Sequence, residues 1–173
     1  MCQEQQGTQK TNNSLRGKIN LDKYYIAYGS NMSVEQMKTR CPDARPIGTA
    51  VLRGWRLVFR LHANIEKQDG GEVPVVVWAI SQRDERYLDH YEGFPNYYHK
   101  KTMPVKVKLF SGGHETVDAM VYIMNDGRPA EIPYIDYYSV IAEGYRHFGF
   151  NPKVLREALR YTDFVESLHA TLE

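Results

Sequence analysis

The feature that most restricts the fold is a short, almost wholly apolar run at 73–80, with the sequence VPVVVWAI. A run of this length that is rich in β-branched residues is typical of a strand, and its lack of alternation with polar residues indicates that both faces are buried. We therefore predict a buried strand at Val73–Ile80. The rest of the chain must supply the elements that cover it.

Other patterns predict further strands and fewer helices. Gly54, inside a long alternating stretch, indicates a bulge or a sharp bend. Asp69-Gly70-Gly71 is a turn signal, so residues 62–72 are predicted to be a loop. The predicted order is a strand at Tyr24–Tyr28, a short helix capped by Ser33, strands at Ile47–Leu61 and Val73–Ile80, a helix from Ser81 to Gly93, a hairpin of Met103–Phe110 and Thr116–Met124, a helix over 133–148 and a last helix that begins at Asn151 and Pro152.

This order predicts the fold class. Helices are fewer than strands and do not alternate regularly with them, which disfavours a doubly wound sheet and favours a mixed α+β domain with a curled sheet or a small barrel. No internal repeat or linker divides residues 21–173, so we expect a single domain there. Residues 1–20 are polar and aperiodic, and we predict that they form a flexible tail. Gly144, inside a predicted helix, indicates close packing, because glycine there costs about 1 kcal/mol relative to alanine.

Composition excludes several classes of function. The net charge is +1, so no bulk electrostatic attraction to nucleic acid or to an anionic membrane is expected. No apolar run approaches the roughly 18 residues that a membrane-spanning helix needs. The two cysteines, Cys2 and Cys41, lie in a polar tail and a short helical segment, which disfavours a structural disulfide. We therefore expect a cytoplasmic protein.

The first candidate site is Tyr28-Gly29-Ser30-Asn31, between the first strand and the first helix. A strand that runs into a tight turn before a helix leaves several backbone N–H groups without a helical partner. Glycine lets another group approach closely, and such a set of donors can hold a carboxylate or a developing oxyanion. A plain turn whose serine or asparagine caps the helix explains the same four residues, so both interpretations stay open.

The second candidate is Glu92, at the predicted end of a helix and among aromatic residues. A carboxylate there faces the negative end of the helix dipole, and aromatic neighbours remove water from it. Both effects raise its pKa above the usual ~4.3, toward that of a general base that works near neutral pH. Thirteen tyrosines against six phenylalanines also suggest a half-polar pocket. The alternative is an exposed glutamate whose position is accidental.

Several motifs, taken in order, resemble the γ-glutamylcyclotransferase-like family. They are YIAYGSNM, RCPDA followed by GTAVLRGWRLVF, LDHYEGFPNYYHK, and IPYIDYYSVIAEGYRHFGF. The resemblance runs from about residue 24 to residue 150 and includes Tyr137 and Gly144. Its specificity lies in the ordered set of motifs rather than in any one of them.

The resemblance implies a small β-barrel surrounded by helices. It implies that Tyr28-Gly29-Ser30-Asn31 binds the γ-glutamyl group of a small-molecule substrate and that Glu92 transfers the proton. Tyr137 matches one pocket tyrosine, and either Tyr98 or Tyr97 matches another. The implied reaction is intramolecular aminolysis, in which a γ-glutamyl amide or peptide gives 5-oxoproline and a free amine or amino acid.

That reaction needs no nucleophilic side chain, because nucleophile and electrophile belong to one substrate molecule. We therefore expect no cofactor, and no metal either, since the six histidines show no metal-ligand spacing. Nucleic acid and membrane partners are not expected, and a homodimer stays open. Two alternatives remain: a variant specific for γ-glutamylamines, and a non-catalytic module of the same fold that binds a small acid or another protein.

Overall fold

The structure of the protein is a computed structural model that describes residues 20–172, with side chains described as far as residue 168. The tail predicted for residues 1–20 therefore lies outside the described residues, apart from Asn20. The strands are β1 (Lys23–Ala27), β2 (Arg45–Arg60), β3 (His62–Ile80), β4 (Tyr98–Leu109) and β5 (His114–Met124). The helices are η1 (Ser30–Met32), α1 (Val34–Arg40), α2 (Gln82–Glu92), α3 (Ile135–His147) and α4 (Pro152–Leu172).

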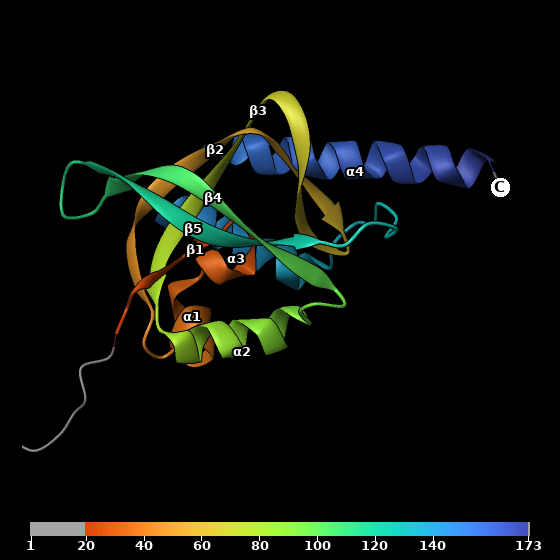
Figure 1. Cartoon of the computed structure of the whole chain (residues 1–173). Helices are drawn as coiled ribbons and strands as arrows, with labels where there is room; N and C mark the ends of the chain where they lie inside the picture. The colour runs from red at the N-terminus through yellow and green to blue at the C-terminus, as the bar shows by residue number, and fades with distance from the viewer. Residues whose placement is uncertain (1–19, 173) are drawn as a thin grey trace, which may run out of the picture.

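The strands close into a barrel in the order β1-β3-β2-β4-β5, with helices around it (Figure 1). All neighbouring strands are antiparallel except β1 and β5, which are parallel and complete the ring. The α+β class with a small barrel, predicted from the order of elements and from the family resemblance, is thus confirmed. β3 lies between β1 and β2, and its Val73 and Val75–Ile80 are buried. The prediction of a strand covered on both faces is also confirmed.

The predicted loop at 62–72 is wrong, because β3 begins at His62 and pairs with β2 over residues 62–67 and again from Glu72. The chain reverses instead at Leu61, which has a left-handed φ of 63°. The polar residues belong to an exposed two-stranded ribbon, where backbone pairing rather than side-chain burial defines the strand. Residues 68–71 lie opposite Gly54 at a register shift, so the glycines of the turn signal mark a bulge. The bulge predicted at Gly54 is confirmed.

β4 also begins earlier than predicted, at Tyr98 rather than Met103. Its first residues read YHKKT, which carries no apolar alternation, yet they pair with the end of β5 from Tyr98↔Met124 to Thr102↔Met120. The hairpin partner therefore extends a strand that its own sequence does not indicate. This extension makes Tyr98 part of the barrel wall.

The helices cover different sides of the barrel. α1 and α2 lie on one side, and α4 runs along the opposite side with its C-terminal half extending past the strands (Figure 1). α3 packs on η1 so closely that a Cβ atom on Gly144 would lie 3.1 Å from Cβ of Met32, which confirms the predicted close packing. None of the helices within residues 20–172 has the length and apolar character needed to cross a membrane.

Gly48 tests how tightly the barrel closes between β2 and β4. A Cβ atom there would lie 2.2 Å from the Lys108 carbonyl oxygen and 2.7 Å from Cγ1 of Val107, so Gly48→Ala forces the backbone of β4 outward. We expect the free energy of unfolding, measured by urea denaturation, to fall by about 1–3 kcal/mol, the usual cost of overpacking. Val51→Ala on the same strand, where the side chain is 45% exposed, is the control. Equal stability of the two variants would contradict the tight closure.

Candidate active site

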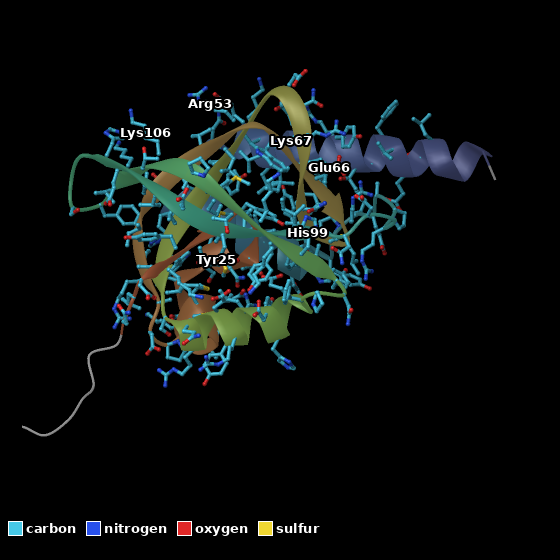
Figure 2. All side chains as sticks on the ribbon, in the orientation of Figure 1. Tyr25, Arg53, Glu66, Lys67, His99 and Lys106 are labelled. Atoms are coloured by element: carbon cyan, nitrogen blue, oxygen red, sulfur yellow. The ribbon has the colours of Figure 1, made fainter. Side chains whose placement is uncertain are left out.

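A hollow of about 340 Å³ opens on the barrel and is lined mainly by tyrosines. Figure 2 shows one of them, Tyr25, on the side of the barrel that faces α2. The tyrosines come from β1, α2, β4, β5 and α3 and from the segments beside them, and they are Tyr25, Tyr28, Tyr91, Tyr97, Tyr98, Tyr122 and Tyr137. The same hollow is lined by Gly29, Ser30, Asn31 and Glu92. Every residue predicted for the site therefore lies at one place, although two candidate segments are 61 residues apart in sequence.

The turn after β1 is closely surrounded at Gly29. Gly29 has φ −116°, which any residue can adopt, so its lack of a side chain matters for space. A Cβ atom there would lie 3.2 Å from Cβ of Ala63 and 3.3 Å from the hydroxyl of Tyr137. Ser33, whose Oγ accepts from the amide of Gln36, caps α1. The capping interpretation therefore accounts for Ser33 and leaves Ser30 and Asn31 for another purpose.

Asn31 connects the turn to the rest of the site. Its side chain is buried, with 4% of the residue exposed. The amide nitrogen Nδ2 donates to Oε1 of Glu92 at 2.8 Å and to the hydroxyl of Tyr25 at 2.9 Å. The amide oxygen Oδ1 accepts from Nη1 of Arg40 at 2.6 Å. Sequence reasoning missed Tyr25 and Arg40, since neither stands out from an ordinary strand or helix residue.

Glu92 reaches the hollow because of how α2 ends. The helix begins with a capping box between Ser81 and Asp84 and ends at Gly93, which adopts a left-handed conformation with φ 65°. The amide of Phe94 then donates to the Asp89 carbonyl at 2.9 Å. Glu92 is the last helical residue before this reversal, and it lines the hollow rather than the outer surface. The alternative of an accidental exposed glutamate does not fit this position.

The surroundings of Glu92 give its carboxyl group an unusual pKa. Burial is the main cause and raises the pKa to about 7, while the positive charge of Arg40 and the hydrogen bond from Asn31 oppose the shift. Part of the residue still meets solvent, so the hollow gives a proton a path to water. At neutral pH both the acid and its carboxylate are present, which is the condition for accepting and returning a proton.

Two tyrosine hydroxyls meet the backbone of Ala63 on β3. Tyr98 donates to the Ala63 carbonyl at 3.0 Å, and the Tyr137 hydroxyl accepts from the Ala63 amide at 3.1 Å. Burial raises the pKa of both tyrosines far above the physiological range, so they stay neutral. Sequence reasoning missed Ala63 because it lies in the segment predicted to be a loop.

Both of the tyrosines between which the sequence could not choose line the hollow. Tyr98 is buried in the barrel wall, whereas Tyr97 is partly exposed, and its hydroxyl lies 3.3 Å from Nδ1 of His62. The guanidinium carbon of Arg128 lies 3.5 Å from the centroid of the Tyr97 ring. Burial, followed by the charge of Arg128, lowers the pKa of His62, with Glu131 opposing. The partly exposed part of the lining therefore contains an imidazole that is neutral at pH 7, and an arginine stacks on the tyrosine beside it.

Metal ligands do not gather here or elsewhere in the described part of the chain, where no three His, Cys, Asp or Glu side chains are placed to hold an ion. A second hollow is lined by Trp55, Glu66, Lys67 and His99 among others. Figure 2 shows Glu66 and Lys67 in the upper part of the view, away from α2 at the bottom. The residues predicted from sequence all belong to the first hollow.

Comparisons with known proteins give the family that this chain matches and solved structures with the same fold. Residues 25–139, more than half of the chain, match the family described as gamma-glutamyl cyclotransferase, AIG2-like. A mouse gamma-glutamylcyclotransferase is 28% identical over 148 residues, which cover 79% of this chain and 76% of the mouse protein. A solved gamma-glutamyl cyclotransferase structure has a TM-score of 0.64 at 25% identity and covers 83% of this chain and 86% of its own. A human protein described as uncharacterized has the same fold, with a TM-score of 0.60 at 24% identity over 83% and 85% of the two chains.

The raised pKa of Glu92 makes a prediction about stability. The folded pKa is about 7 and the unfolded value is ~4.3, so protonation stabilises the folded protein fully below about pH 4.3, and this stability is lost as pH rises through 7. Glutamine does not titrate. Between pH 4.5 and pH 8, the free energy of unfolding of Glu92→Gln should therefore rise relative to wild type by on the order of 1–3 kcal/mol. Urea denaturation at the two pH values measures this.

The matched control for that measurement is Glu143→Gln, because Glu143 is exposed on α3. Its stability relative to wild type should not change between the two pH values. If Glu92→Gln behaves like this control, then the Glu92 carboxyl is not shielded from water as its position in the hollow indicates.

Proposed function

This chain belongs to the gamma-glutamyl cyclotransferase, AIG2-like family, and from that premise we propose that it converts a γ-glutamyl amide or peptide to 5-oxoproline and a free amine or amino acid. The family supports an enzyme of gamma-glutamylcyclotransferase type. The observation that carries the proposal is the partly buried Glu92 carboxyl, whose Oε1 lies 2.8 Å from Nδ2 of Asn31 in the hollow that Gly29 and Ser30 also line.

The reaction is an intramolecular aminolysis. The α-amine of the substrate attacks its own γ-carbonyl carbon, and a new carbon–nitrogen bond closes a five-membered ring. The carbon–nitrogen bond to the leaving group then breaks. Two protons leave the attacking nitrogen, one from the α-ammonium group before the attack and one as the ring closes. The departing nitrogen takes up two protons and leaves as an ammonium group, so no other reactant is consumed.

Glu92 carries out the proton transfers in this proposal. Its carboxylate accepts a proton from the α-ammonium group, and the resulting acid returns a proton to the leaving nitrogen. A pKa of about 7 suits both steps, because neither form is strongly disfavoured at neutral pH. The hydrogen bond from Asn31 holds one carboxylate oxygen and leaves the other for the substrate.

The turn at Tyr28-Gly29-Ser30-Asn31 binds the γ-glutamyl group. The first amides of a helical turn have no partner within it, so those that begin η1 are available to the γ-carbonyl oxygen or to the α-carboxylate. One donor to a tetrahedral oxyanion is typically worth ~3 kcal/mol of barrier. The missing side chain of Gly29 allows the substrate to approach, and holding the glutamyl chain folded for ring closure lowers the barrier further.

The tyrosines shape the pocket around the folded substrate. Tyr98 and Tyr137, whose hydroxyls are fixed by the backbone of Ala63, form the deep part of the lining. Because their hydroxyls stay neutral, they offer polar contacts without adding a negative charge beside Glu92. Tyr97 lies nearer solvent and has a different role, because in this proposal it contacts the leaving group.

The leaving group decides between the main proposal and a γ-glutamylamine-specific variant. Arg128 stacks on Tyr97 beside the hollow, and none of the described carboxylates forms an ion pair with it. An unpaired guanidinium suits a leaving group that carries a carboxylate. This favours an amino acid or peptide over a simple amine.

Glu92→Gln tests the proton transfer directly. Glutamine keeps the shape and a hydrogen-bonding group but cannot accept the proton, so turnover should fall by ~10²-fold or more, the usual scale for a general base. Mass spectrometry of 5-oxoproline after incubation with a panel of γ-glutamyl compounds measures the product, and circular dichroism checks the fold. Near-normal turnover would remove Glu92 from the mechanism. A wild-type protein that makes no 5-oxoproline from any compound would favour the non-catalytic module.

Arg128→Gln tests the leaving group. The substrates are γ-glutamylalanine and γ-glutamylethylamine, which differ by one carboxylate. We expect wild type to prefer the alanine compound in kcat/KM and the variant to lose about two- to fivefold of that preference, the scale of an exposed ion pair. Lys106→Gln, which changes an exposed lysine of β4, is the charge-matched control. Equal losses for both substrates would contradict a carboxylate contact.

A further inference from the structure

Arg40 lies behind the proposed site and does not line the hollow, yet it contacts residues of two segments that build it. Its Nη1 donates to Asn31 Oδ1 at 2.6 Å and to Ser30 Oγ at 3.3 Å, and its guanidinium carbon lies 3.9 Å from the centroid of the Tyr91 ring. We propose that Arg40 is a positioning residue that fixes which way the Asn31 amide faces, so that Nδ2 is always presented to the Glu92 carboxylate. The proposal rests on the proposed function only in its kinetic test.

The chemistry of the three partners dictates the orientation of the amide. A guanidinium group has donors and no acceptor, so it can pair only with Oδ1 of Asn31. The nitrogen Nδ2 must then face Glu92, whose carboxylate only accepts. Turning the amide by 180° would place its NH₂ against Arg40 and its oxygen against Glu92, which creates two repulsive contacts.

Without Arg40, the reversed amide no longer places its NH₂ group against a guanidinium. Its oxygen still faces Glu92, and this contact is repulsive when Glu92 is ionised and acceptable when Glu92 is protonated. The protonated acid can itself donate to Oδ1, so reversal favours the protonated form. Arg40 therefore selects the amide orientation that suits the carboxylate. This is the form that the proposed reaction needs at its start.

Arg40 is held where this role requires. It is the last residue of α1, and the amide of the next residue, Cys41, donates to the Met37 carbonyl at 2.8 Å. Tyr91, on which its guanidinium stacks, directly precedes Glu92 on α2. The same arginine thus contacts η1 through Asn31 and α2 through the ring of Tyr91, and it links the two segments that carry the proposed site.

The charged and titratable groups around Glu92 determine what pH measurements can reveal. The tyrosines that face it are Tyr25, Tyr28, Tyr98, Tyr122 and Tyr137, and burial raises the pKa of each well above its usual value. Burial also raises the pKa of the Cys41 thiol and lowers that of His62. His90, on α2, also lines the hollow and carries an imidazole.

The positive charge of Arg40 lowers the pKa of Glu92, so its removal must raise it. In Arg40→Met, the acid limb of the profile of kcat/KM against pH should move to higher pH by about one unit, and kcat/KM at pH 7 should fall by about tenfold, the scale of one hydrogen bond to a charged group. At pH values above the shifted acid limb, the loss of kcat/KM should be smaller. Arg40→Lys keeps the charge and a donor and should restore most of the wild-type profile.

Three controls separate positioning from general damage. Lys38→Met changes an exposed lysine on the same helix, whose ion pair is with Glu35, and should leave the profile unchanged. His90→Gln identifies any limb that belongs to its imidazole. In an Asn31→Ala background, the effect of Arg40→Met should shrink to the part that the lost charge alone produces, because the amide that Arg40 positions is gone.

Several results would overturn the proposal. They are a uniform loss of activity at every pH, a loss that Arg40→Lys does not restore, and a loss that persists in full in the Asn31→Ala background. If wild type produces no 5-oxoproline, the proposed function fails, and Arg40 is then tested by ¹³C NMR titration of the Glu92 carboxyl. An unchanged titration midpoint in Arg40→Met would overturn the positioning role. A midpoint that Arg40→Met raises more in the wild-type background than in the Asn31→Ala background would support it without any activity.

Discussion

The hydrogen bond between Nδ2 of Asn31 and Oε1 of Glu92 is the contact on which the architecture of the hollow depends. It joins a turn at the end of β1 to the last residue of α2, and Asn31 is buried while Glu92 is partly buried. A buried carboxyl without a donor is costly, and a buried amide without an acceptor is also costly. Each partner therefore offsets the free-energy cost of burying the other. The barrel brings these two segments together, and the bond keeps them in register.

The position of α2 is fixed at both ends by ionic contacts outside the hollow. At its start, Asp43 accepts from Ser81 Oγ at 2.8 Å and from Nη2 of Arg83 at 2.5 Å. Near its end, Asp89 accepts from the Tyr122 hydroxyl at 2.6 Å and is paired with a lysine of β4. Because Tyr122 belongs to β5 and also lines the hollow, the helix is attached to the barrel wall on the side where Glu92 lies. Movement of α2 as a whole would break both contacts.

Sequence reasoning could locate residues whose own chemistry is unusual for their place in the chain. Glu92 stands out because an acid at a helix end among aromatic rings is costly, and Gly29 because a glycine after a strand permits close approach. Arg40 and Ala63 do not stand out: one resembles any basic residue in the last turn of a helix, and the other contributes only its backbone. Their roles arise from contacts between segments far apart in sequence. The start of β4 was missed for the same reason, since β5 rather than its own alternation makes it a strand.

The parallel contact of β1 with β5 has a consequence beyond the hollow. It is made by only two residue pairs, Tyr24↔Ala119 and Tyr25↔Met120, but it completes the ring. Among the described residues, the sheet around this ring has no terminal strand, so another polypeptide cannot extend it by backbone pairing there. Any self-association at the ring has to use side-chain surfaces. The closed ring thus leaves no strand edge there that could serve as a template for aggregation.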